Sequence, residues 1–213
     1  LNFNNYIKEY DERGVVSGNA KLEKIGFNAW KPKIILKELE KMKKNDILIY
    51  RDSNTKKYEI LKNYNNIKKI SDFVLKECNF DLFVPRETEY IKLKHHTKGI
   101  VLEELGENHE FTKNFPNLII NIIIVKKTEK SIEVLKEWEK ACLNEKFIDG
   151  DEYNIKNNNL RWSCPEQSLL SVIISKWILK NKIPRDYPKI GFKDRNIENI
   201  IKFKNYDYLN YLN

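Results

Sequence analysis

Short apolar runs alternate with segments of helical periodicity along this 213-residue chain, and the alternation indicates the class of fold. Apolar runs of strand length occupy 46–51, 80–84 and 118–125. The first is continuous rather than alternating, which is typical of a buried parallel strand. We therefore expect an α/β domain with a mixed, mainly parallel sheet flanked by helices.

Four segments between and after these runs are predicted to be helices. Pro32 suits the first turn of a helix whose apolar residues recur on one face. A second helix is expected at 65–77, and Thr128 is predicted to cap a third. The fourth begins at 163–166 and is apolar nearly all round, so it should be deeply buried.

The charge balance restricts the partners that this chain can have. Lys and Arg number 39 against 31 Asp and Glu, which gives a net charge of +8. Such an excess favours nucleic acid, an anionic membrane or a phosphorylated small molecule. Most of it is lysine in a chain that is also rich in Asn and Ile, so part of the signal reflects composition rather than function.

The three cysteines are odd in number and far apart, at Cys78, Cys142 and Cys164. Neither a disulfide framework nor a zinc pattern follows from their spacing. Reduced thiols indicate a cytoplasmic protein, and no apolar run approaches the ~20 residues that a membrane span needs.

We expect one domain over 1–213 with two distinctive segments. The polar stretch 86–116 contains all three histidines and is predicted to be a mobile active-site insertion. The stretch 184–213 is a basic tail with several aromatic residues. Leu1 is not a start methionine, and little precedes the first helix, so an N-terminal truncation is one interpretation.

The most informative local pattern is an apolar strand that leads directly into Asp52, Ser53 and Asn54. Ligands of open α/β sheets bind beyond the carboxyl ends of the strands. A carboxylate there, with a second oxygen ligand two residues later, suits a divalent ion that also binds a diphosphate. On spacing alone, the same residues are also a common turn.

A family resemblance adds to this pattern. The segment 26–36 reads GFNAWKPKIIL and the segment 45–54 reads NDILIYRDSN. Together they resemble a block of bacterial and viral glycosyltransferases that contains W-K-P-x-I-I and, further on, G-D-I-L-x-Y-x-D-x-G. The segment 121–127, Trp138 and the Pro-Glu-Gln-Ser stretch at 165–168 resemble later parts of that family, where the last reads D-Q-S.

The resemblance implies a GT-A fold, a nucleotide-sugar donor and Mn²⁺ or Mg²⁺. Asp52 would bind the metal and the diphosphate, with Asn54 in place of the family's second acid or small residue. Lys31 would be a donor-phosphate or structural lysine. Trp30 would border the nucleotide or pack in the core, and Asn121 is a further donor-binding candidate.

Glu166 and Gln167 are predicted to begin the buried helix, where a negative charge is favourable. The resemblance implies that they face the sugar, with Glu166 as a catalytic candidate in place of the family's aspartate. Simple charge complementation of the helix is the alternative.

Glu87 and Glu89 follow the strand at 80–84, and either is a candidate base for an acceptor hydroxyl. The family's T-K-R-D stretch is altered here, since Leu93 and Lys94 follow Lys92.

The leading hypothesis is therefore a metal-dependent glycosyltransferase that moves a sugar from a nucleotide-diphosphate donor to a glycan or lipid-linked acceptor. Its setting would be surface polysaccharide or glycoconjugate synthesis, in the cytoplasm or peripherally at the inner membrane face.

Two alternatives stay open. A nucleic-acid-binding module would use the lysine excess and the aromatic tail, although no recognition motif is present and no nucleic-acid partner is expected. The second alternative is a transferase-like scaffold that has lost catalytic activity and acts through protein contacts.

Overall fold

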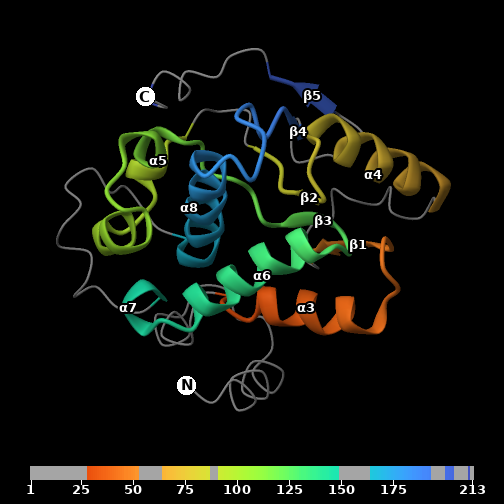
Figure 1. Ribbon diagram of the computed structural model, residues 1–213, viewed down its shortest axis with the longest axis horizontal. Helices are drawn as coiled ribbons and strands as arrows, with labels where there is room; N and C mark the ends of the chain where they lie inside the picture. Colours follow the sequence, from red (N-terminus) through yellow and green to blue (C-terminus); the bar gives the residue numbers. More distant parts are fainter. Residues whose placement is uncertain are drawn as a thin grey trace.

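The computed structural model describes residues 28–52, 64–86, 91–148, 164–192, 200–203 and 211. Within these ranges the chain forms a three-stranded sheet and a two-stranded sheet, with helices around them (Figure 1). The expectation of a mixed α/β protein is confirmed at this level.

The three-stranded sheet contains β1 (Ile47–Arg51), β2 (Leu82–Phe83) and β3 (Ile122–Lys126), in the order β1-β3-β2. The central strand β3 is antiparallel to both neighbours. The prediction of a parallel strand at 46–51 was therefore wrong. β1 and β2 run in the same direction, but β3 separates them.

The direction of β1 could not be deduced from its apolar residues. A continuous apolar run indicates that both faces of a strand are covered, whatever the direction of its neighbour. In β3, the four residues from Ile122 to Val125 are buried. The five residues of β1, at the edge of the three-stranded sheet, are each half-buried.

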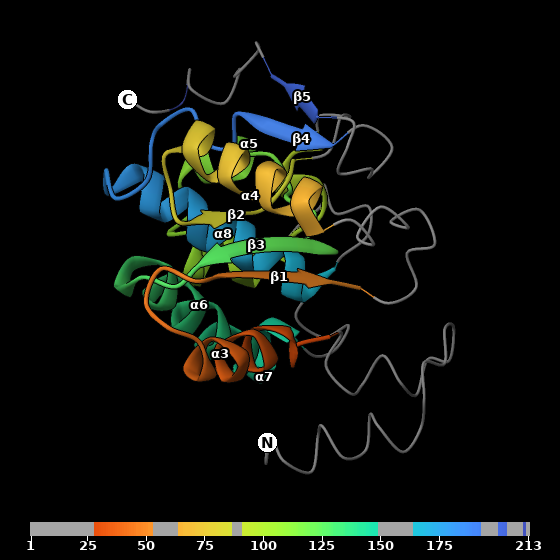
Figure 2. The same ribbon diagram turned by 90° about the vertical axis from the view of Figure 1, so that its right-hand side faces the viewer.

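Two long helices lie side by side next to β1, and a third lies by β2 (Figures 1 and 2). The pair consists of α3 (Lys31–Lys41) and α6 (Glu129–Cys142), and the third is α4 (Tyr64–Cys78). Pro32 lies in the first turn of α3, as predicted. Thr128 caps α6 as predicted, and Ser131 completes a reciprocal capping box with it.

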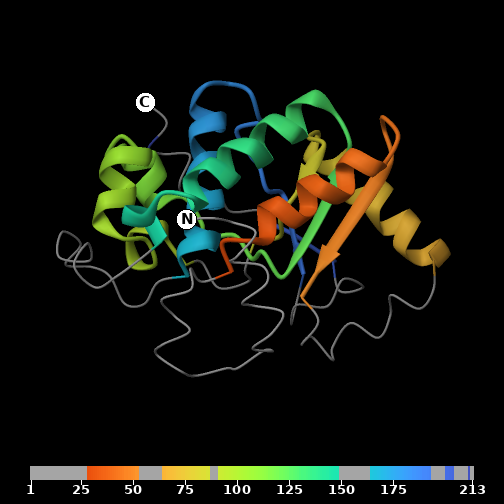
Figure 3. The ribbon, with the colours of Figure 1, turned by 90° about the horizontal axis from the view of Figure 1, so that it is seen from below.

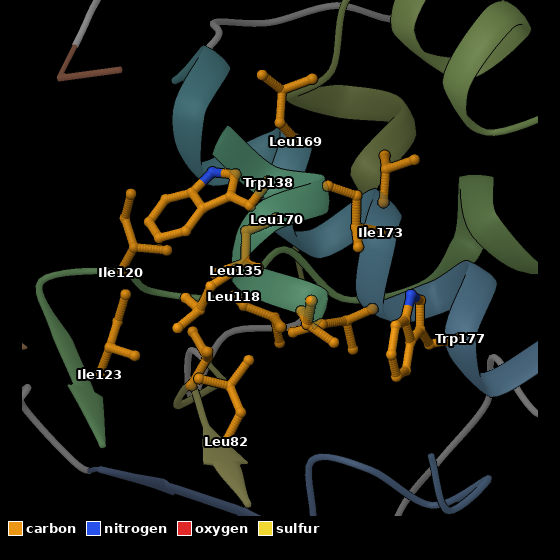
Figure 4. Close-up of a cluster of buried hydrophobic side chains, with 14 of the residues drawn as sticks. Leu82, Leu118, Ile120, Ile123, Leu135, Trp138, Leu169, Leu170, Ile173 and Trp177 are labelled. Carbon is orange, nitrogen blue, oxygen red and sulfur yellow. The ribbon is translucent and has the colours of Figure 1, made fainter. Parts of the chain in front are cut away.

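The helix α8 (Pro165–Leu179) forms the centre of the molecule, and it is buried on nearly all sides, as predicted. It packs against α6, the short helix α7 (Glu145–Ile148) and the segment that precedes β3. Figure 4 shows Trp138 of α6 and Trp177 of α8 among the aliphatic side chains of this core. In the described part of the chain, no helix combines the length and the apolar character that crossing a membrane requires.

The stretch 86–116 was predicted to be an active-site insertion, and its part 91–116 forms short helices. These are the 3₁₀ turn η2 (Leu93–His95), the π-helical turn η3 (Val101–Leu105) and α5 (Glu110–Asn114). All three pack against α8. His96, which follows η2, is buried, with only 3% of its surface exposed.

Three serines on one side of α8 hold the segment 96–118 in place. The hydroxyl of Ser168 donates to the carbonyl of His96 at 2.7 Å. Ser171 accepts a hydrogen bond from the Leu118 amide at 3.0 Å, and Ser175 donates to the Thr112 hydroxyl at 3.0 Å. Buried hydroxyls that are paired in this way fix the register between α8 and the preceding segment.

The two-stranded sheet consists of β4 (Ile190–Phe192) and β5 (Ile200–Lys202). Gly191 forms a parallel bridge with Arg86, which ties this sheet to the segment that follows β2. A Cβ atom on Gly191 would lie 2.5 Å from the Arg86 carbonyl oxygen and 2.7 Å from the Phe203 ring, so the close approach requires glycine. Apart from Tyr211, the tail beyond 203 lies outside the described residues.

Candidate functional site

The candidate site lies at the edge of the sheet where β1 and β2 end and β3 begins. Since β1 and β2 run in the same direction, their carboxyl ends meet at one edge. Asp52 directly follows β1, and its amide donates a hydrogen bond to the Asn121 carbonyl at 2.9 Å. Two predicted site residues are thereby adjacent through their backbones.

Lys31, Asp52 and Glu166 converge at this edge from α3, β1 and α8. The Lys31 ammonium lies 3.3 Å from each carboxylate oxygen of Asp52 and 3.7 Å from Glu166 Oε1. Lys31 is 3% exposed and Glu166 is 5% exposed. We call these three residues the Lys31 triad. The first turns of α3 and α8 come together beside it (Figure 3).

Two further contacts position Glu166. Its main-chain carbonyl accepts a hydrogen bond from Trp138 Nε1 at 2.8 Å, which ties the start of α8 to α6. Its carboxylate accepts one from Asn28 Nδ2 at 3.3 Å. Asn28 has φ of 60°, in the left-handed region that Asn tolerates better than most residues. The turn at Asn28 therefore directs its amide towards α8 as the chain enters α3.

The electrostatics of the triad favour a Glu166 that can hold a proton. Burial raises the pKa of Glu166, whereas the Lys31 ammonium and the Asn28 amide oppose the rise, and the charge of Asp52 adds to it. Burial, and next the charge of Glu166, raise the pKa of the Cys142 thiol well above its usual value. The thiol of Cys142 is therefore a neutral neighbour rather than a nucleophile.

Asp52 is the accessible member of the triad, with 25% of its side chain exposed. Its Oδ1 accepts a hydrogen bond of 2.6 Å from the Tyr50 hydroxyl. Tyr50 and Asp52 are two positions apart, which places them on the same face of an extended segment. The carboxylate is thus held by a hydroxyl and an ammonium, while part of it faces solvent.

The remaining predicted site residues lie next to the triad in sequence or outside the described residues. Trp30 precedes Lys31 at the N-cap of α3, and Gln167 follows Glu166 in α8. The Gln167 carbonyl accepts a hydrogen bond from Ser171, which is a helical contact rather than a site contact. Asn54, Glu87 and Glu89 lie outside the described residues.

Sequence reasoning missed Tyr50, Asn28 and Trp138 as parts of the site. Tyr50 was discoverable, because strand periodicity places it beside Asp52. The pairing of Asn28 with Glu166 depends on how α3 packs near α8, and no local pattern encodes it. Trp138 was named as part of the family resemblance but was given no role in the site, whereas its indole N–H donates to the Glu166 carbonyl.

Among the described residues of this site, Asp52 is the one that could bind a divalent cation. The residues that the structure describes contain no group of three or more His, Cys, Asp or Glu side chains that could hold a metal ion. Mg²⁺, however, commonly takes one or two carboxylates and completes its shell with water and phosphate oxygens. The partly exposed Asp52 carboxylate meets that requirement, and Lys31 balances its charge on the buried side.

Comparison of the chain with protein-family models, with curated proteins and with solved structures finds no match.

Proposed function

We propose that this chain is a glycosyltransferase of the nucleotide-diphospho-sugar type, with Asp52 at the donor site. The convergence of Lys31, Asp52 and Glu166 carries the proposal. These three residues were nominated from separate parts of the sequence, and they meet at one edge of the sheet. Ligands of α/β proteins commonly bind at such an edge.

The fold supports the proposal in one respect. β1 and β2 run in the same direction, so the segments after both strands leave from the edge where Asp52 lies. We propose that the three-stranded sheet belongs to a GT-A-like domain whose sheet is mixed, with β3 as its antiparallel member. The resemblance of the segments 26–36 and 45–54 to glycosyltransferases supports the same assignment.

Each member of the Lys31 triad has a role that follows from its position. Asp52, partly exposed, binds the donor's polar end. Lys31 sets the orientation of the Asp52 carboxylate and places a fixed positive charge beside the departing nucleoside diphosphate. Glu166, with its raised pKa, holds or releases a proton at its carboxyl oxygens as the charge of the site changes.

A divalent cation bound through Asp52 would neutralise the negative charge of the diphosphate. Asn54 is the proposed second ligand. The acceptor is proposed to be a glycan or a lipid-linked sugar, and the net charge of +8 suits a peripheral position on an anionic membrane surface. On this proposal the enzyme acts in the cytoplasm, where nucleotide-sugar donors are available to it.

A donor screen tests the proposed function. Purified protein is titrated with a panel of nucleotide sugars in the presence and absence of Mn²⁺, by calorimetry and by release of free nucleotide. We expect metal-dependent binding of one donor, and loss of that binding in Asp52→Asn. This substitution keeps the shape of the side chain and removes its charge.

Asp46→Asn is the matched control, because Asp46 precedes the same strand at its opposite end and is exposed. This variant should bind the donor as the wild type does. Binding of no donor by a folded wild-type protein, or equal binding by Asp52→Asn, would overturn the proposal.

A further inference from the structure

A second polar site lies at the other end of strands β1 and β3 from Asp52. A half-open cleft of about 540 Å³ lies where β1 begins and β3 ends, beside the last turns of α4. Ile47 and Lys126, which are paired across the two strands, both line it. The five residues of β1 therefore separate this cleft from the Lys31 triad.

Positive charge predominates in the cleft. Lys76, Lys126, Lys130 and Lys182 line it, together with two acids, Asp72 and Asp81. The four lysines come from α4, β3, α6 and the turn after α8, so the fold and not a local run of sequence assembles them. Lysine ammonium groups gathered in a concave site attract an anion more strongly than they would on a flat surface.

In the described part of the chain, three of these lysines form no ion pair with a carboxylate. Lys182 pairs with Glu133 at 2.8 Å and lies 4.2 Å from the centre of the Trp177 ring. Among the residues that the structure describes, no acid lies within ion-pairing distance of the ammonium groups of Lys76, Lys126 or Lys130. By contrast, Lys33, Lys176 and Lys202 each form an ion pair with a glutamate.

The acids and the apolar wall narrow the class of ligand. The carboxylates of Asp72 and Asp81 can accept hydrogen bonds from hydroxyl groups of a ligand, and they would repel a ligand that is anionic throughout. Leu75 and Phe80, both nearly buried, form an apolar wall that can pack against carbon atoms. The volume lies within the usual range for small-molecule sites. A ligand with one phosphate beside several hydroxyl groups matches this combination.

We propose that this cleft binds a phosphorylated polyol, with the phosphate on Lys76, Lys126 and Lys130 and the hydroxyl groups on Asp72 and Asp81. A soluble sugar phosphate and a phospholipid headgroup that carries glycerol share this chemistry. The inference does not rest on the proposed transferase activity, because none of these residues belongs to the Lys31 triad.

The test uses glycerol 3-phosphate and inorganic phosphate as soluble probes, with binding followed by calorimetry and by amide NMR shifts at constant ionic strength. The triple variant Lys76→Gln, Lys126→Gln and Lys130→Gln should bind glycerol 3-phosphate at least about tenfold more weakly, since each lost contact involves a charged group. The double variant Asp72→Asn and Asp81→Asn should weaken glycerol 3-phosphate more than it weakens inorganic phosphate.

A matched control carries the same loss of charge outside the cleft. Lys37, Lys136 and Lys140 are exposed on α3 and α6, and their replacement by Gln should leave binding unchanged. Equal binding by the cleft variant and the wild type, or an equal loss in the control, would overturn the site. An equal effect of the aspartate variant on both probes would overturn the assignment of the hydroxyl groups.

Vesicles distinguish the two sources of the ligand. Phosphatidylcholine vesicles with and without phosphatidylglycerol are sedimented with each protein. Recruitment by phosphatidylglycerol that the cleft variant loses and the control variant keeps identifies a lipid headgroup. Binding of glycerol 3-phosphate without such recruitment identifies a soluble ligand, and a folded wild type that binds neither probe contradicts the proposal.

Discussion

The ammonium group of Lys31 lies 3.3 Å from both carboxylate oxygens of Asp52, although Lys31 is only 3% exposed. A buried cation is tolerated when its charge is offset by close anions and its hydrogen bonds are made. Here the anions come from two other elements, β1 and α8. The Lys31–Asp52 ion pair therefore contributes to the geometry of the candidate site and to the stability of the fold, and each contribution can be measured.

Lys31→Met should destabilise the protein by about 3–5 kcal/mol, because it leaves buried Glu166 and adjacent Asp52 without their cation. Adding Glu166→Gln should recover at least about 1 kcal/mol of this loss. Urea denaturation at neutral pH measures both. Lys33→Met is the control: Lys33 pairs with Glu139 at 3.0 Å, 37% of its side chain is exposed, and its loss should cost less than about 1 kcal/mol. A similar loss in both single variants would contradict the role given to Lys31.

Stability should depend on pH through Glu166 in a defined direction. Burial raises its pKa in the folded chain above the usual 4.5, so the folded state binds the proton more tightly than the unfolded chain. The resulting stabilisation is complete below pH 4.5 and is lost as the pH rises through the raised folded value. The wild type should therefore lose stability relative to Glu166→Gln between acidic and neutral pH. Denaturation curves at a series of pH values test this, and the opposite slope would refute it.

Tyr50→Phe should weaken donor binding by roughly two- to tenfold, because the Asp52 carboxylate loses a hydrogen bond that orients it. Its stability should fall by no more than about 1 kcal/mol, since Tyr50 and Asp52 are both partly exposed. Calorimetric titration with the donor found in the screen gives the first value.

Tyr187→Phe is the comparison for Tyr50→Phe. The buried Tyr187 hydroxyl accepts from the Val84 amide and donates to the Leu82 carbonyl. Its loss should cost about 1–3 kcal/mol of stability and leave donor affinity unchanged. If the two variants affect affinity equally, Tyr50 has no specific role at the site.

Trp138→Phe should reduce both stability and donor binding. It removes the indole N–H that holds the Glu166 carbonyl and leaves a void in the core, at a cost of about 2–4 kcal/mol. Trp177→Phe, in the same core, removes a contact to Glu137 at 3.0 Å and should lower stability without weakening donor binding. Thermal denaturation and donor titration of both proteins separate the two effects.

Some of the fold followed from the sequence because single elements carry its signal. α8 was predicted correctly, since a segment that is apolar all round must be buried. Pro32 and Thr128 marked the starts of α3 and α6 through their own backbone chemistry. The position of Asp52 after β1 followed from the length of one apolar run.

The rest depends on contacts between distant segments. The direction of β1 is set by its pairing with β3, which its own residues do not encode. The turns η2, η3 and α5 are too short to show a helical period, so the stretch 86–116 was predicted to be a mobile active-site insertion and not a series of short helices. Lys31, Asp52 and Glu166 were nominated separately, but their meeting follows from the packing of α3, β1 and α8.

The central position of β3 also has a consequence for synthesis on the ribosome. β1 and β2 both precede β3 in the chain, and within the described residues each is paired in the three-stranded sheet only with β3. Neither edge strand can complete its ladder until β3 has emerged, so the sheet forms late and through contacts of long sequence separation. In nascent chains arrested before Asn121, the amides of β1 should exchange rapidly with solvent. In chains extended far enough beyond Lys126 for β3 to leave the ribosome, the same amides should be protected.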